Sequence, residues 1–142
     1  MKKKFTVILL VAILAFLLPM QALAAEGPAI DDPIKPSWIA IDAYYNHFSI
    51  NKYGLAKLGT SVECNPNVNK IEITQKLQQY TNGRWVTIKS WTEVHLDSCI
   101  AIMERQWFVS RNYNYRMTSS ASVYIDGTYI EYVSYTSPVH WY

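Results

Sequence analysis

Cys64 and Cys99 are the only thiols in the chain, and a thiol can act as a nucleophile, bind a metal ion or form a disulfide. Neither cysteine has a neighbouring His, Lys or Arg in the sequence that would activate it, so a catalytic thiol is not expected. In an oxidising compartment the pair could form a disulfide, which would close a loop of about 35 residues and stabilise the fold by roughly 3–4 kcal/mol. Two reduced thiols packed as small apolar side chains are the alternative.

Glu93, His95 and Asp97 form the one pattern in the sequence that could bind a metal ion. In an extended strand these alternate residues would project from one face about 7 Å apart, and imidazole and carboxylate groups are common metal ligands. Such sites usually take a further ligand from elsewhere, and no motif places His47 or His140 nearby. A solvated strand or loop face is the alternative, and we expect no resident metal or cofactor.

The sequence carries no signature of an enzyme. It has no Gly-x-Ser-x-Gly elbow and no glycine-rich phosphate loop, and its Ser, His and Asp residues follow no spacing that would assign a triad. No pair of carboxylates stands out as a general acid and base. We therefore expect a protein that is not an enzyme.

Aromatic side chains are the residues most open to a binding role, since Phe, Trp and Tyr make up 14% of the chain. Tyr80, Trp85 and Trp91 cluster around one expected hairpin and are the candidate ligand contacts. An exposed ring combines apolar area with a polar group, so it can stack on a sugar or anchor a protein partner. Cross-strand pairing of the rings, which would stabilise a sheet without any ligand, is the alternative.

The elements that would position these residues are strands. Apolar and polar residues alternate from Lys70 to Trp91, and the alternation is interrupted at Asn82-Gly83, which readily supplies the positive φ angles of a tight hairpin turn. Trp85 and Trp91 are an even number of positions apart, so a regular strand places them on one face. Asp126-Gly127 predicts a second antiparallel hairpin near the C-terminus.

From Ser37 onward the chain is dense in Val, Ile, Thr, Tyr and Trp, which favour strands. We expect residues 37–142 to form one domain, an all-β, antiparallel β-sandwich of about seven strands that is immunoglobulin-like or fibronectin-III-like. The expected strands are Trp38–Ile50, Leu55–Cys64, Lys70–Tyr80, Arg84–Trp91, Leu96–Val109, Tyr113–Ile125 and Tyr129–Tyr135.

An immunoglobulin-like strand order makes two local predictions. Cys64 would close the second strand and Cys99 would open the fifth, which lie side by side, so the two sulfurs could meet. Tyr113 follows a polar turn at the position of a tyrosine corner, whose hydroxyl hydrogen-bonds to the backbone upstream. A strand that is simply rich in tyrosine is the alternative.

The first 24 residues predict where the protein works. A positive stretch, Lys2–Lys4, precedes an apolar run, Phe5–Leu18, and Ala22–Ala24 presents small residues at the positions that a signal peptidase recognises. The apolar run is shorter than the roughly 20 residues of a spanning helix, so a signal peptide over residues 1–24 and no integral membrane anchor are expected. Residues 25–36 are rich in proline and predict a flexible arm. We expect a secreted, extracellular protein.

The charge of the chain depends on this leader. The whole sequence has a formal net charge of +2, with 13 basic and 11 acidic residues, but three of the basic residues lie in the leader. The exported chain would then carry 10 basic and 11 acidic residues. A domain so close to neutral is not expected to bind nucleic acid.

Several of these residues form motifs that resemble a family of uncharacterised small secreted proteins of Gram-positive bacteria. The shared motifs are a KI-x-I-x-x-x-LQ strand, a G-x-W-x-T-x-x-SW strand and a Y-x-YR strand. The matching residues here are Lys70, Ile71, Ile73, Leu77, Gln78, Gly83, Trp85, Thr87, Ser90, Trp91, Tyr113, Tyr115 and Arg116. The resemblance covers most of the chain after the leader and implies a signal peptide and this fold, but no activity. The two cysteines and a longer segment around Val94–Arg105 depart from the family pattern.

The expected function is therefore that of a secreted, non-enzymatic binding module. Its partner would be an envelope glycan or a protein, contacted through aromatic side chains of one sheet or of the loops. A bacteriocin-like or toxin-like secreted effector, acting by assembly on a target cell, is the alternative. Fold-level analogy alone does not decide between them.

Overall fold

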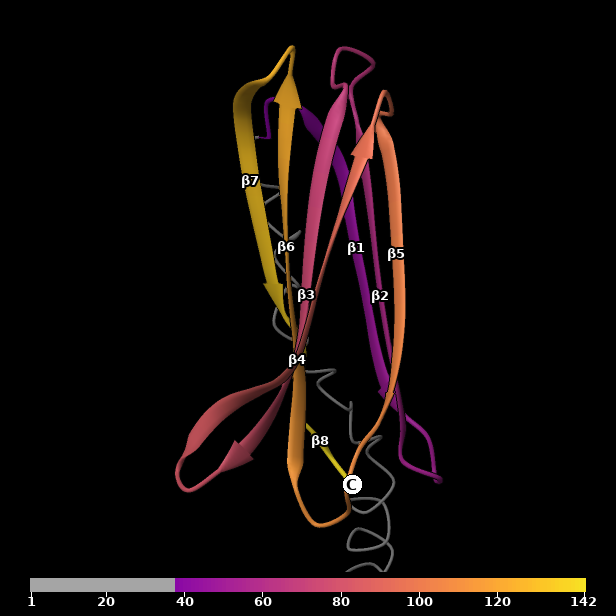
Figure 1. Ribbon diagram of the computed structural model, residues 1–142, viewed down its shortest axis with the longest axis vertical. Coiled ribbons are helices and arrows are strands. Elements are labelled where there is room, and N and C mark those ends of the chain that lie inside the picture. The colour runs from indigo at the N-terminus through magenta and orange to yellow at the C-terminus, as the bar shows by residue number, and fades with distance from the viewer. Residues whose placement is uncertain (1–37) are drawn as a thin grey trace, which may run out of the picture. The chain divides into compact units, whose positions relative to one another are not determined.

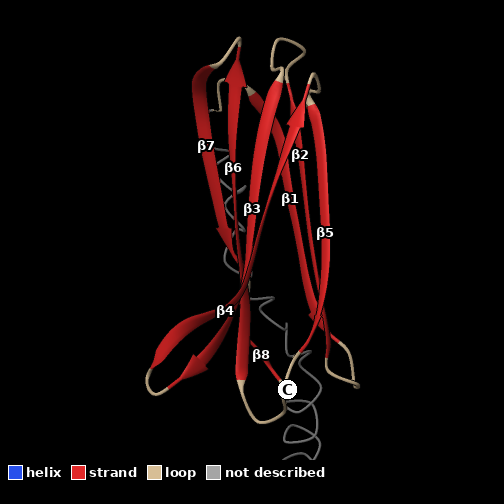
Figure 2. Ribbon diagram, viewed as in Figure 1, coloured by secondary structure: helices blue, strands red, loops and turns tan. Residues whose placement is uncertain are grey.

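Two antiparallel sheets form a β-sandwich in the computed structural model, which describes residues 38–142 (Figures 1 and 2). The predicted leader, residues 1–24, and the predicted arm, residues 25–36, lie outside the described residues. Sheet A has the order β1-β2-β5, and sheet B has the order β4-β3-β6-β7 with β8 paired to β6. The strands are β1 (Ile41–Ile50), β2 (Leu55–Cys64), β3 (Lys70–Thr81), β4 (Arg84–Leu96), β5 (Ile100–Phe108), β6 (Asn114–Ile125), β7 (Thr128–Thr136) and β8 (His140–Trp141). In this part of the chain no helix is long and apolar enough to cross a membrane.

The all-β, antiparallel sandwich that the sequence predicts is confirmed, but several strand bounds differ from the predicted ones. The first strand begins at Ile41 and not at Trp38, and β4 continues past Trp91. Leu96 ends β4 and does not begin the fifth strand, because Asp97 turns the chain with a φ of 53°. The short strand β8 was not expected. In the constant-type immunoglobulin order the fourth strand joins the sheet of the first, second and fifth strands. Here β4 pairs with β3, so the assignment to the immunoglobulin or fibronectin-III group stays a prediction.

Both predicted hairpin turns are confirmed. Asn82 and Gly83 have φ angles of 52° and 77°, and Asp126 and Gly127 have φ angles of 49° and 80°. Two positive φ angles in a two-residue loop match the twist of the flanking strands. The turns fix which residues of β3 lie opposite which residues of β4, and likewise for β6 and β7.

The tyrosine corner is formed by Tyr115 and not by Tyr113, so that prediction is wrong by two positions. Tyr115 is fully buried, and its hydroxyl donates a hydrogen bond to the Ser110 carbonyl oxygen at 2.8 Å and accepts one from Gln79 Nε2 at 2.9 Å. Tyr113 precedes β6 and is 38% exposed. The expected alternation places Tyr113 and Tyr115 on one face, but β6 begins at Asn114, one residue later than expected, so Tyr115 is the first tyrosine inside the strand.

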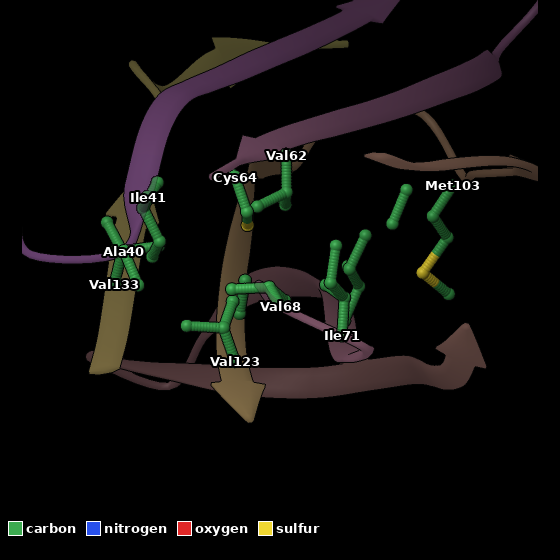
Figure 3. Packing of buried hydrophobic residues seen from close by; sticks show 12 residues of the cluster. Ala40, Ile41, Val62, Cys64, Val68, Ile71, Met103, Val123 and Val133 are labelled. Atoms are coloured by element: carbon green, nitrogen blue, oxygen red, sulfur yellow. The ribbon is translucent and has the colours of Figure 1, made fainter. Parts of the chain in front are cut away.

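The interior between the sheets contains two separate apolar clusters. The larger one includes Ile41 of β1, Val62 of β2, Ile71 of β3 and Val123 of β6, and Figure 3 shows these side chains together. The smaller one is built around Phe48, Leu58, Leu77, Tyr115 and Met117. Each of β1, β2, β3 and β6 contributes to both clusters, so the clusters follow one another along the strands.

A layer of polar side chains separates the two clusters, and we call it the polar belt: Tyr44, Asn46, Thr60, Gln75 and Ser119. Gln75 Nε2 donates to Thr60 Oγ1 at 2.9 Å, and Thr60 Oγ1 donates to Asn46 Oδ1 at 3.0 Å. Ser119 Oγ donates to the same Asn46 oxygen at 2.5 Å and lies 2.6 Å from the Tyr44 hydroxyl. The belt therefore links both sheets through hydrogen bonds inside the sandwich.

Polar side chains also close the two open sides of the sandwich. On one side the Glu131 carboxylate of β7 accepts hydrogen bonds from the backbone N–H groups of residues 39–41, at 2.9 to 3.1 Å, where the chain enters β1. On the other side, between β4 and β5, Glu93 forms an ion pair with Arg105. Lys89 Nζ lies 4.0 Å from the centre of the Trp107 ring at the same edge.

Candidate functional site

The two cysteines are neighbours, as the strand order predicts, but they are free thiols and the expected disulfide is absent from the described residues. The Cys64 N–H donates to the Cys99 carbonyl oxygen at 2.8 Å. Cys64 is only 6% exposed and belongs to the larger apolar cluster, against which Cys99 also packs (Figure 3). Burial, and to a lesser degree the Asp42 carboxylate, raise the pKa of Cys64 to about 12. The thiols act as small apolar side chains, which was the alternative.

The Glu93, His95 and Asp97 triplet does not assemble into a metal site. Glu93 is occupied by its ion pair with Arg105, and His95 Nε2 lies 3.7 Å from Glu93 Oε2. Asp97 lies beyond the end of β4, where the turn redirects the chain. Within residues 38–142 no three His, Cys, Asp or Glu side chains are placed to hold a metal ion.

The three candidate ligand contacts fall on two different faces of sheet B. Tyr80 and Trp85 lie opposite each other on β3 and β4, and their ring centres are 5.2 Å apart. Trp91 lies opposite the buried Gln75 and packs against both apolar clusters. The expectation that Trp85 and Trp91 share a face is therefore wrong, and Trp91 is a core residue.

A β-bulge in β4 separates the two tryptophans. The register between β3 and β4 shifts between Leu77 and Gln78, and Ile88 is the extra residue on β4. One inserted residue reverses the alternation of faces, so Trp85 points outward and Trp91 inward although they are an even number of positions apart. Figure 1 shows the hairpin end of β3 and β4, which begins near this bulge, lying apart from β1, β2 and β5.

The outer face of sheet B carries a regular array of hydroxyl groups at its centre. Two adjacent rows of side chains cross all four long strands, because residues that lie opposite each other share a face of the sheet. From β4 to β7 the rows are Thr92, Thr74, Ser120 and Ser134, and Ser90, Lys76, Thr118 and Thr136. We call these eight positions the hydroxyl face, since seven of them are Ser or Thr.

A shallow hollow of about 140 Å³ lies over the hydroxyl face. Its lining includes Thr74, Thr118 and Thr136 from the two rows, and Tyr132 borders it on β7. Of the described residues that line the hollow, Lys76 is the single charged side chain. The hollow therefore offers hydroxyl donors and acceptors around one ammonium group.

Aromatic side chains stand at one end of the hydroxyl face, around the hairpin of β3 and β4. The Arg116 guanidinium lies 4.3 Å from the centre of the Trp85 ring, and Arg116 Nε donates to Gln78 Oε1 at 2.8 Å. Tyr80 is 42% exposed beside Trp85. Trp141 of β8 lies opposite Asn114 of β6 at this same end and is largely exposed.

A second aromatic group stands at the opposite end of the same face. Tyr124 and Tyr129 lie opposite each other on β6 and β7 with ring centres 5.8 Å apart. Lys70 Nζ lies 4.3 Å from the centre of the Tyr124 ring. Tyr132 lies opposite Ser122, between this pair and the hollow, and is half exposed. The hydroxyl face is thus bordered by aromatic rings at both ends.

The hydroxyl face is not among the sites that the sequence motifs predict. Its signal is present, because every second residue of 118–122 is Thr or Ser while the residues between them are buried. Such a run predicts a polar strand face by itself. Only the register of four strands shows that the hydroxyl groups of β3, β4, β6 and β7 form continuous rows.

No known protein family, curated protein or solved structure matches this chain. The resemblance to small secreted proteins of Gram-positive bacteria therefore stays a prediction.

Proposed function

We propose that the protein is an exported, non-enzymatic binding module that holds an extended polysaccharide on the outer face of sheet B. The observation that carries the proposal is the hydroxyl face with aromatic rings at both of its ends. A hydroxyl group is both a donor and an acceptor, so an array of them complements the hydroxyl groups of a sugar chain. The aromatic rings supply flat apolar surfaces on which sugar rings can stack.

The dimensions of this face favour a polymer over a small molecule. The aromatic groups at the two ends are ten residues apart along β3, from Lys70 to Tyr80, which corresponds to about 33 Å at the rise of a strand. The hollow between them is shallow, whereas sites for small ligands usually enclose most of the ligand surface. An extended chain lying along the strands would contact both ends at once.

The composition of the face also favours a glycan over a protein partner. Protein interfaces usually have an apolar, well-packed centre and a polar rim. The order is reversed here, since hydroxyl groups occupy the centre and aromatic rings stand at the ends. This distribution supports sugar binding.

The test measures the affinity of the purified protein for a panel of neutral and acidic soluble polysaccharides by isothermal titration calorimetry. The variant is Tyr132→Ala, at the border of the hollow. Tyr132 is 53% exposed, and the matched control, Tyr45→Ala, removes a tyrosine of sheet A that is 63% exposed. We expect Tyr132→Ala to raise Kd about tenfold for a polysaccharide that binds, which corresponds to about 1.4 kcal/mol, and Tyr45→Ala to leave Kd unchanged. Binding to no member of the panel, or equal weakening by both variants, would overturn the proposal.

A further inference from the structure

We propose that the polysaccharide bound by the hydroxyl face is anionic, with a carboxylate or phosphate on its repeating unit. This inference rests on the proposed function, and it names the chemistry of the ligand. The charges on the two outer faces of the sandwich and the surroundings of Lys76 support it.

Cations outnumber acids on the outer face of sheet B. The positions of β3 and β6 that face outward include Lys70, Lys76 and Arg116, against one acid, Glu72. The Glu72 carboxylate lies 4.0 Å from Lys70 Nζ, so the negative charge of this acid is paired with Lys70. The face has a net positive charge, although the chain after the leader is close to neutral.

The outer face of sheet A has the opposite balance. The outward-facing positions of β2 and β5 include two acids, Glu63 and Glu104, and one cation, Lys57. The charge of the sandwich is therefore divided between its two faces. A polyanion would be attracted to the outer face of sheet B and repelled by that of sheet A. This difference in charge would direct the polyanion to the hydroxyl face.

Lys76 is placed to receive one anionic group. It lies in the second row of the hydroxyl face, opposite Ser90 and Thr118, and it is exposed. It forms no ion pair with any described residue. An ammonium group has three donors and no acceptor, and the neighbouring hydroxyl groups can donate to the remaining lone pairs of a carboxylate or phosphate.

Arg116 supplies a second cation next to Lys76. Arg116 lies opposite Gln78, one row further along the strands and on the adjacent strand, so the two backbone positions are about 8 Å apart. Its guanidinium is held over Trp85 and by Gln78 Oε1, which fixes its position before any ligand binds. Two cations at this distance along one face, one of them held in place, favour a polymer that repeats its negative charge over an isolated anion.

The experiment compares polymers that share a sugar backbone and differ in charge. Polygalacturonate and its methyl ester test a carboxylate source, and phosphomannan and dephosphorylated mannan test a phosphate source. We expect the charged member of at least one pair to bind about tenfold more tightly than its neutral partner at low salt. This difference should shrink between 0.1 and 1 M salt, as the Debye length falls from about 10 to 3 Å.

The matched variants are Lys76→Gln in the hydroxyl face and Lys57→Gln on the outer face of sheet A. Lys76→Gln should lower the affinity for the charged polymer by a larger factor than that for the neutral one, so that the ratio of the two affinities falls. Lys57→Gln should change neither affinity.

Equal binding of charged and neutral polymers would overturn the inference and leave the proposed function standing, whereas binding of no polymer would overturn the proposed function itself. If both variants lost the preference for the charged polymer, the preference would come from the net charge of the protein. That result would contradict the role of Lys76.

Discussion

At the level of single residues, the buried phenol of Tyr115 shows how one hydroxyl group holds a connection between the sheets. Its hydroxyl joins the Ser110 carbonyl, in the turn before β6, to the Gln79 amide of β3. Tyr113 lies two residues away and is partly exposed. The two tyrosines therefore offer a comparison between a buried hydroxyl with partners and an exposed one.

We predict that Tyr115→Phe lowers the free energy of unfolding by about 1–3 kcal/mol, because it leaves the Ser110 carbonyl and Gln79 amide without this partner. Tyr113→Phe should change it by less than about 0.5 kcal/mol. Urea denaturation followed by tryptophan fluorescence measures both values. Similar losses of unfolding free energy in the two variants would show that the hydrogen bonds of the Tyr115 hydroxyl do not stabilise the fold.

At the level of elements, the parts of the fold that sequence could predict are those determined locally. The Asn82-Gly83 turn and the bounds of β2 follow from the conformational preferences of a few adjacent residues. The position of Trp91 does not, because the bulge at Ile88 depends on how β4 fits the buried side of β3. The hydroxyl face is also non-local, since its rows combine residues from four strands.

The turn between β1 and β2 contains a glycine that the packing requires. Gly54 has a φ of +83°, and a Cβ there would lie 2.8 Å from the Tyr142 ring and 2.9 Å from the Val109 carbonyl oxygen. Its own carbonyl accepts a hydrogen bond from the Val109 N–H at 2.9 Å. Gly59, in β2, is different, because a Cβ there would meet only His47 Cβ at 3.7 Å.

We predict that Gly54→Ala lowers the free energy of unfolding by about 2 kcal/mol or more, from the strained φ and the clash with Val109 and Tyr142. Gly59→Ala should change it by no more than about 1 kcal/mol, since an ordinary strand conformation accepts a side chain. Thermal unfolding followed by circular dichroism compares the two. A Gly54→Ala protein as stable as Gly59→Ala would contradict the close contact at the turn.

At the level of the whole molecule, the buried thiol of Cys64 couples stability to pH. Burial raises its pKa from 9.0 to about 12 and also raises the pKa values of Tyr44 and Tyr115. A group whose pKa is higher in the folded state than in the unfolded state makes its full contribution to the free energy of unfolding at pH values below its unfolded-state pKa. That contribution is lost as the pH rises from about 9 toward 12, because the unfolded state releases the proton first.

We therefore predict that the free energy of unfolding decreases between pH 9 and 12 and that Cys64→Ala reduces this decrease. The comparison isolates the thiol, because Tyr44 and Tyr115 titrate in the same direction in both proteins. Chemical denaturation at a series of pH values measures the slopes. Identical slopes in the two proteins would show that Cys64 does not carry the effect.

The polar belt has a consequence for how the two sheets are aligned. Apolar burial is non-directional, so contacts between apolar side chains specify the alignment of two sheets less strictly than hydrogen bonds do. The hydrogen bonds from Gln75 to Thr60 and from Ser119 to Asn46 join the sheets at one relative position only. Sliding by one pair of residues would press these groups against the apolar clusters and leave them unpaired, at about 1–3 kcal/mol each. The hydrogen bonds of the polar belt therefore select a single alignment of the two sheets, which the apolar clusters alone would specify less strictly.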